Sequence, residues 1–196
     1  MEEKSNSIWK DAIKPSLILS LISIIISVII YVFDLVTISL FSGLFIWVIA
    51  FVIYVVVLAY LMKAYRNENF GGFIRYGKAF TFGLVITLIS SVILSGYYII
   101  FNTVIDPEYE KNITIKMQEK TEEYMISKGL PDEAIEDAME KSQEKMKKQQ
   151  ERGILIKTGF SFLGSIIILV LTSLIAAAFA KKNKDPYQSA MQDIEE

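Results

Sequence analysis

Four long stretches without a charged side chain dominate this sequence. They cover residues 15–33, 35–62, 79–105 and 158–180, and each holds 19 or more residues. A helix needs about 20 residues to cross a hydrocarbon core of roughly 30 Å. Hydrophobic residues make up 53% of the chain while its charged residues gather in blocks between the runs, a pattern that suits lipid better than a soluble core. The runs therefore predict four transmembrane helices.

The expected fold class is an all-α membrane protein with an extramembrane helical hairpin between the third and fourth spans. The spans are expected at about 15–33, 41–62, 79–105 and 154–180. The remaining segments are an N-terminal tail, the charged hairpin and a C-terminal tail, at residues 1–14, 106–153 and 181–196. The first apolar run is long enough to span, and no small-residue cleavage motif follows it. We therefore expect a retained span rather than a signal peptide.

Basic residues mark one side of the predicted membrane. The connection after the second span and the start of the C-terminal tail carry the predicted anchors, Lys63, Arg66, Arg75, Lys78, Lys181 and Lys182. The N-terminal tail adds Lys4, Lys10 and Lys14, whereas the connection at 34–40 has no basic residue. Short cytoplasmic segments are enriched in Lys and Arg, so both termini and the second connection are expected in the cytoplasm. Aromatic residues of the same connection suit the head-group level of the bilayer.

The segment at 106–153 is charged throughout and falls on the other side by parity. It holds nine Lys or Arg against thirteen Asp or Glu, a net charge of −4 (9 − 13). Long segments cross membranes largely regardless of charge, so this balance does not oppose an external location. Gly129 suits a helix end, and Asp132 and Glu133 suit the first turn of a second helix. The segment is therefore expected to form two helical arms.

A thin apolar stripe runs along the second arm. Ile135, Met139 and Met146 lie at helical spacing on one face. One interpretation is that the stripe holds the two arms of a charged spacer together. The other is a partner surface, because flexible thioethers adapt to different contacts. Both interpretations stay open at the level of sequence.

Small and hydroxylated residues follow one face of three predicted spans. They are Ser16, Ser20, Ser23 and Ser27 in the first, Gly83, Thr87 and Ser91 in the third, and Ser161 and Ser165 in the fourth. Small residues let helices approach closely in a bilayer, and hydroxyls bond across helices. Helix packing is the favoured interpretation. The alternative is a polar seam for a small solute or a lipid head group.

The sequence offers little for catalysis. It contains no histidine and no cysteine, and no ionisable residue lies in the centre of a span. Histidine or cysteine nucleophilic pairs are thus excluded, and the usual mark of an intramembrane catalyst is missing. Tyr31 with Asp34, and Asp106 with Glu108, are the boundary groups that a membrane enzyme would have to use. We predict no enzyme activity, no catalytic residue and no cofactor.

Ligand motifs are equally weak. Asp106, Glu108 and Glu110 are expected to form a solvated helix start rather than a metal site. Gly71 and Gly72 lack the strand and spacing that a nucleotide-binding loop requires. The net charge of −2 gives no basic footprint for nucleic acid.

Several segments, taken in order, resemble one family. They are YRNENFGGFIRYGKAFTFG after the second run, IDPEY, GLPDEAIEDAMEK and SLIAAAFAKK. From about Ala12 to Lys182 the chain resembles the bacterial membrane family catalogued as domain of unknown function 4199, found mainly in Bacteroidetes. The resemblance implies a four-span protein of a Gram-negative inner membrane with a long loop before the last helix. It implies no activity, cofactor or catalytic residue.

Two functions follow as hypotheses. The first is a non-enzymatic accessory or scaffold protein of the inner membrane, whose external hairpin contacts a membrane or periplasmic protein partner. The second is a small transporter or channel component with a Ser/Thr-lined seam between spans. The lipid bilayer is the expected partner of either, and the sequence leaves monomer and homo-oligomer open.

Overall fold

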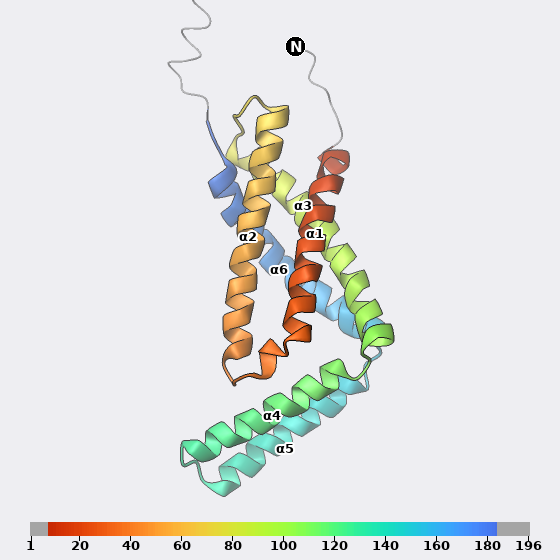
Figure 1. Ribbon diagram of the computed structural model, residues 1–196, viewed down its shortest axis with the longest axis vertical. Helices are drawn as coiled ribbons and strands as arrows, with labels where there is room; N and C mark the ends of the chain where they lie inside the picture. Colours follow the sequence, from red (N-terminus) through yellow and green to blue (C-terminus); the bar gives the residue numbers. More distant parts are fainter. Residues whose placement is uncertain (1–7, 184–196) are drawn as a thin grey trace, which may run out of the picture. The chain divides into compact units, whose positions relative to one another are not determined.

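The structure is a computed structural model that describes residues 8–183 as a chain of α-helices (Figure 1). These are α1 (Ile8–Val32), α2 (Ser42–Asn69), α3 (Tyr76–Ile100), α4 (Tyr109–Ser127), α5 (Asp132–Gln150) and α6 (Ile154–Ala180). A 3-10 turn, η1 (Leu35–Thr37), follows α1, and a π-helical turn, η2 (Phe101–Ile105), ends α3. Within this range no strand forms, and only Ile74 and Lys182 pair as an isolated bridge. The all-α class is confirmed.

Four of the helices, α1, α2, α3 (continued by η2) and α6, are long and apolar enough to cross a membrane. They keep large apolar side chains exposed, such as Val56 at 61% and Ile167 at 70%, as lipid-facing residues do. The chain is therefore a multi-pass membrane protein, as predicted.

The helices begin and end differently from the apolar runs. α1 starts at Ile8, before the expected bound at residue 15, and α2 continues to Asn69 instead of stopping at 62. Charged turns at the head-group level remain helical, so hydropathy marks the span and not the helix end. The last span begins at Ile154, where it was expected. Most of the predicted tails, residues 1–7 with Lys4 and residues 184–196, lie outside the described part.

The chain divides into two compact units. The first comprises residues 1–21, 52–91 and 166–196, and the second comprises residues 22–51 and 92–165. Each of the four apolar helices contributes a segment to both units.

The first unit contains the apolar core. Phe82, Leu58 and Ile86 are fully buried in it, and the small side chains of Ala176 and Ala180 let α6 approach closely. Apolar burial alone gives little drive in lipid, where the tails are as apolar as leucine. Close packing and interhelical hydrogen bonds therefore stabilise this core.

Hydroxyl groups connect the helices of the first unit. Ser16 Oγ of α1 donates to the Ile86 carbonyl of α3 (3.2 Å), and Ser90 Oγ of α3 donates to the Ser16 carbonyl (3.1 Å). Thr87 of α3 and Ser173 of α6 join through their hydroxyls (3.2 Å). These side chains are fully buried, so the polar groups lie inside the helix contact rather than along an open path.

The connection between α2 and α3 is fastened to the end of α6. Arg66 donates to the Ala180 carbonyl (2.8 Å), where the helix dipole places partial negative charge. Ile74 and Lys182 exchange backbone hydrogen bonds of 2.9 and 3.1 Å. The turn at Gly71 and Gly72 has φ values of +57° and +88°, which favour glycine. These two glycines therefore form a tight structural turn between α2 and α3.

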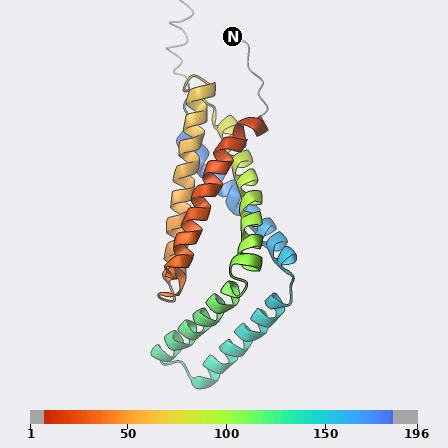
Figure 2. The same cartoon turned by 45° about the vertical axis from the view of Figure 1, so that its right-hand side comes forward.

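In the second unit, α4 and α5 run antiparallel as the predicted hairpin (Figure 2). Gly129, with φ +70°, ends the first arm: its N–H donates to the Ile126 carbonyl, and Leu130 N–H donates to the Met125 carbonyl. This is the predicted glycine stop, formed because the left-handed conformation costs glycine little.

The end of α3 widens into a π-helical turn just before the hairpin. Asp106 N–H donates to the Phe101 carbonyl (2.9 Å), five residues back. The Asn102 side chain donates to the Tyr98 carbonyl, one turn back along the helix (2.9 Å). Pro107 cannot continue the helix. The sequence NTVIDP therefore both ends the span and sets the start of α4.

Candidate functional site

The hairpin leaves the spans through a cluster of aromatic rings in the second unit. Tyr31 at the end of α1 meets Phe101 and Tyr109 edge-on, with ring centroids 5.0 Å apart in both pairs. Phe101 and Tyr109 are themselves 5.3 Å apart and edge-on. The Tyr31 hydroxyl donates to Asp106 Oδ2 (3.2 Å). Edge-to-face pairs of this kind stabilise by roughly 0.5–1.5 kcal/mol each, so the cluster fixes the first turn of α4.

Two ion pairs lie beside this aromatic cluster, at the base of the hairpin. Lys116 Nζ of α4 lies 2.7 Å from Asp34 Oδ2, and this hydrogen bond holds the pKa of Asp34 below its ordinary value. Lys157 Nζ of α6 lies 3.3 Å from Glu110 Oε2, which also accepts a hydrogen bond from the Tyr98 hydroxyl (3.4 Å). Within the second unit α4 is thus tied to the turn that follows α1, to α3 and to α6.

The lowered pKa of Asp34 predicts acid sensitivity at the base of the hairpin. A depressed carboxyl pKa contributes stability above the pKa of the unfolded state, and that contribution is lost as pH falls through the folded-state pKa. Both side chains are about half exposed, at 50% and 47%, so solvent screens the pair and the effect is small.

Thermal unfolding should show wild type melting slightly above Asp34→Asn at neutral pH, with the two midpoints converging in acid. Lys116→Gln should behave in the same way, because it removes the same contact. A difference in midpoint that stays constant into acid would contradict this pairing.

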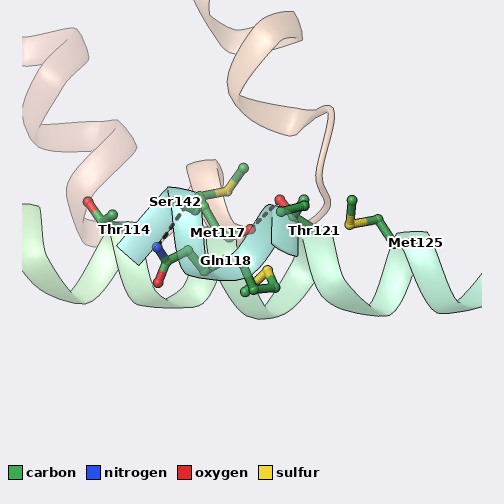
Figure 3. A pocket seen from close by; sticks show the side chains of 8 residues that line it. Thr114, Met117, Gln118, Thr121, Met125 and Ser142 are labelled. Atoms are coloured by element: carbon green, nitrogen blue, oxygen red, sulfur yellow. Dashed lines mark hydrogen bonds between the residues drawn. The ribbon is translucent and has the colours of Figure 1, made fainter. Parts of the chain in front are cut away.

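The two arms of the hairpin meet through a mixed polar and thioether interior (Figure 3). Gln118 Nε2 of α4 donates to Ser142 Oγ of α5 (2.9 Å). A cavity of about 210 Å³ lies beside this bond, and Met117, Met125 and Met139 line it. These methionines therefore face the space between the arms, where flexible side chains fill an irregular gap.

A larger, open groove of about 650 Å³ lies toward the far end of the hairpin. Ile126, Ile135 and Met139 form its apolar lining, with Ile126 still 60% exposed. Its acidic lining consists of one residue of α4 and three of α5, namely Glu122, Asp132, Glu136 and Glu140. We call this surface the acidic groove.

The carboxylates of the acidic groove have no cation within ion-pair distance in the described part of the chain. Four lysines of the same arms pair elsewhere, for example Lys141 with Asp137 and Lys148 with Glu144, both at 2.6 Å. The acidic groove thus combines exposed apolar surface with carboxylates that form no ion pair among the described residues, although Lys141 attracts Glu140 at longer range. Chemically, it is suited to a positively charged segment that also presents an apolar side chain.

Comparison with known proteins gives a single firm result. Residues 14–182 match the family described as "Protein of unknown function (DUF4199)". The chain belongs to the DUF4199 family. No curated protein and no solved structure matches it. The matched range contains most of α1, all of α2, α3 and α6, the base of the hairpin and the acidic groove, so the candidate site belongs to the DUF4199 region.

The residues predicted as a partner surface in this DUF4199 chain lie on α5. Ile135 is buried at 7% exposure and lines the acidic groove. Met139 is half-buried and lines both the groove and the cavity between the arms, whereas half-buried Met146 lines neither. The apolar stripe of α5 therefore faces largely inward. The acidic side chains beside it form the exposed surface.

Two of the three carboxylates expected at the helix start have different partners. Asp106 accepts hydrogen bonds from Tyr31 and from the backbone of Glu108 (3.2 Å each), whereas Glu110 meets Lys157. Across residues 8–183, no group of three or more acidic, His or Cys side chains is arranged to hold a metal ion.

The residues predicted for helix packing fall into two groups. Those of the first unit are buried, and they are Ser16, Ser20, Gly83, Thr87 and Ser91. Those of the second unit are more open: Ser27 and Ser161 are exposed, while Ser23 and Ser165 are half-buried. Ser165 donates to the Phe162 carbonyl of its own helix (2.8 Å).

The predicted basic anchors lie in the first unit. Lys63, Arg75, Lys78, Lys181 and Lys182 are exposed there. Arg66 is half-buried against the end of α6, a structural contact that the sequence pattern did not indicate.

The sequence did not predict the acidic groove or most of the aromatic cluster at the base of the hairpin. Asp132, Glu136 and Glu140 are spaced by four residues, so they share a helix face, and this signal was available. Their convergence with Glu122 and Ile126 depends on how α4 and α5 pair. The contacts of Tyr31 with Phe101 and Tyr109 likewise join distant parts of the chain.

Proposed function

We propose that this DUF4199 protein is a non-enzymatic accessory protein of the inner membrane that docks a partner protein on its hairpin. The observation that carries the proposal is the acidic groove, in which unpaired carboxylates surround exposed apolar surface. Its occupant is a basic amphipathic helix of a membrane or periplasmic protein. Such a helix places an apolar face on the groove lining while its Lys or Arg side chains meet the carboxylates.

The base of the hairpin supports docking rather than a free spacer. The aromatic cluster and both ion pairs hold the first arm in a defined orientation within the second unit. A rigidly held surface loses less entropy on binding than a mobile one.

We further propose that both termini and the α2–α3 connection lie in the cytoplasm, with the hairpin outside. The support is that Arg66, Lys78 and Lys182 gather in the first unit around the joined ends of α2, α3 and α6. Short segments rich in Lys and Arg stay on the cytoplasmic side. The hairpin then meets partners in the periplasm.

A transporter or channel component is the competing function. Its sequence basis was the run of hydroxyls along the spans. In the first unit Ser16, Thr87 and Ser90 are buried and hydrogen-bonded between helices, which supports a packing role. Purified protein in liposomes that moved a small solute would favour transport instead.

Direct binding tests the docking proposal. The probe is a synthetic Lys/Leu amphipathic helix, and full-length protein in nanodiscs is the receptor. Neutralising two groove carboxylates, Glu136→Gln with Glu140→Gln, should weaken binding roughly tenfold, since each exposed ion pair contributes up to about 1 kcal/mol. Added salt should weaken wild-type binding in the same direction.

The matched control neutralises two exposed carboxylates that do not line the groove, Glu119→Gln with Glu133→Gln, and should leave affinity unchanged. A photo-reactive residue at Ile126 should crosslink the probe, whereas one at Lys145 should not. Equal affinities for both variant pairs, or equal binding of an acidic Glu/Leu helix, would rule out the acidic groove as the docking surface.

A further inference from the structure

Two lysines of the first unit rest on the aromatic rings of one tight turn. Lys78 Nζ lies 4.1 Å from the centre of the Phe70 ring, and Lys182 Nζ lies 5.3 Å from that of Phe73. The two phenylalanines belong to the same turn, in which Phe73 N–H donates to the Phe70 carbonyl (3.1 Å). Cation–π contacts restrain both ammonium groups without neutralising their charge.

Backbone pairing brings the second lysine to this turn from the far end of the chain. The reciprocal hydrogen bonds of Ile74 and Lys182 join residues more than a hundred positions apart. Arg75 directly follows Ile74, is exposed, and stands immediately before α3. We call Arg75, Lys78 and Lys182 the loop cluster.

The charge of the loop cluster is not compensated within the described residues. Its three side chains are exposed, and none has a carboxylate at ion-pair distance there. Glu68 is the one acidic residue between positions 63 and 78. A restrained, unpaired group of cations is suited to a phosphate.

The position of the loop cluster in the fold indicates whether the phosphate belongs to a lipid or to a soluble molecule. Arg75 directly precedes α3, and Lys182 follows the end of α6 by two residues. Both helices have the length and composition of membrane spans, so their ends lie at the level of the head groups. A lipid phosphate is concentrated at this level, whereas a soluble phosphate would have to come from bulk water.

We propose that the loop cluster is a binding site for the phosphate of an anionic phospholipid. The restrained lysines and Arg75 contact the phosphodiester, and the Phe70 and Phe73 rings flank it at the acyl boundary. The site is independent of the acidic groove, because it lies in the first unit and requires no partner protein.

Competition between two lipids tests the site. Full-length protein in detergent is offered equal amounts of phosphatidylglycerol and phosphatidylcholine, and retained lipid is counted by native mass spectrometry. Wild type should retain phosphatidylglycerol about tenfold over phosphatidylcholine, and Arg75→Gln with Lys78→Gln should remove most of this preference, as expected for two cations near an anionic surface.

The matched control, Lys145→Gln with Lys147→Gln on the hairpin, should keep the preference. So should Arg75→Lys with Lys78→Arg, which retains charge. If the neutral pair unfolds, Lys182→Gln serves instead, because its pairing with Ile74 uses backbone atoms only. Equal retention of both lipids by wild type, or a preference that survives neutralisation, would overturn the site. Displacement of the lipid by inorganic phosphate at equal concentration would show a soluble-anion site instead.

Discussion

Replacing Gly83 with leucine is expected to destabilise the helix packing of the first unit more than any other single exchange proposed for this chain. A Cβ at Gly83 would lie 3.0 Å from Met62 Sδ, 3.1 Å from Met62 Cε and 3.7 Å from Ser173 Cβ. Met62 is itself buried at 1% exposure and has little room to move. The larger side chain would separate α3 from α2 and α6, at a cost of about 1–3 kcal/mol or more.

The comparison variants for this experiment come from the same chain. A Cβ at Gly159 or Gly164, also in an apolar helix, would meet nothing within 4 Å, so Gly159→Leu and Gly164→Leu should unfold like wild type. Gly83→Ala should cost less than Gly83→Leu, because the end of the Met62 side chain can shift slightly. Met62→Ala should partly rescue Gly83→Leu, a coupling that a double-mutant cycle would measure.

Thermal unfolding in detergent, followed by helical circular dichroism, provides the readout. A melting temperature for Gly83→Leu equal to that of Gly164→Leu would mean that α2, α3 and α6 do not approach as described.

Reversing the charge of the α2–α3 connection is expected to change the membrane topology. The variant combines Lys63→Glu, Arg75→Glu and Lys78→Glu, all at exposed positions. Arg66 is left unchanged, because it donates to the end of α6 and its loss would also disturb packing. The positive-inside bias at this connection is thereby inverted, so a fraction of the chains should insert with it outside.

Cysteine labelling measures that fraction without interference, because the chain has no cysteine. A single cysteine at exposed Glu68 should be protected from an impermeant thiol reagent in intact cells for wild type, and labelled in the charge-reversed variant. The same number of reversals on the hairpin, at Lys141, Lys145 and Lys147, should leave the reporter protected. Labelling of the wild-type reporter would refute the cytoplasmic location of this connection.

The fold and the site differ in how far they follow from sequence. The four spans follow from uninterrupted apolar length, and the hairpin arms follow from Gly129 and the acidic start of α5. These are local signals, because each depends on neighbouring residues and on the requirement that a backbone in lipid satisfies its own hydrogen bonds. The helix bounds at Ile8 and Asn69 were harder to predict from the sequence, because a charged turn continues a helix without any break in its backbone hydrogen bonding.

The hydroxyl stripes show the limit of periodicity more clearly. Ser16 and Ser27 lie on the same predicted face of α1, yet Ser16 is buried against α3 and Ser27 is exposed. Spacing places residues on one face of a helix but carries no information about the length over which a neighbouring helix covers that face. Gly83 and Gly159 are likewise both glycines of apolar helices. Only at Gly83 would an added Cβ meet another side chain within 4 Å.

The sequence by itself determined that this chain crosses a membrane with four helices and bears a charged hairpin, since length, hydropathy and charge act locally. The tertiary structure decided which carboxylates are neutralised and which remain free. Asp34 and Glu110 meet lysines of distant elements, while Glu122, Glu136 and Glu140 gather in the acidic groove without an ion-pair partner among residues 8–183. The physical reason is that a charge is paired or unpaired only through the groups that the fold brings within a few ångströms, whatever their separation along the chain.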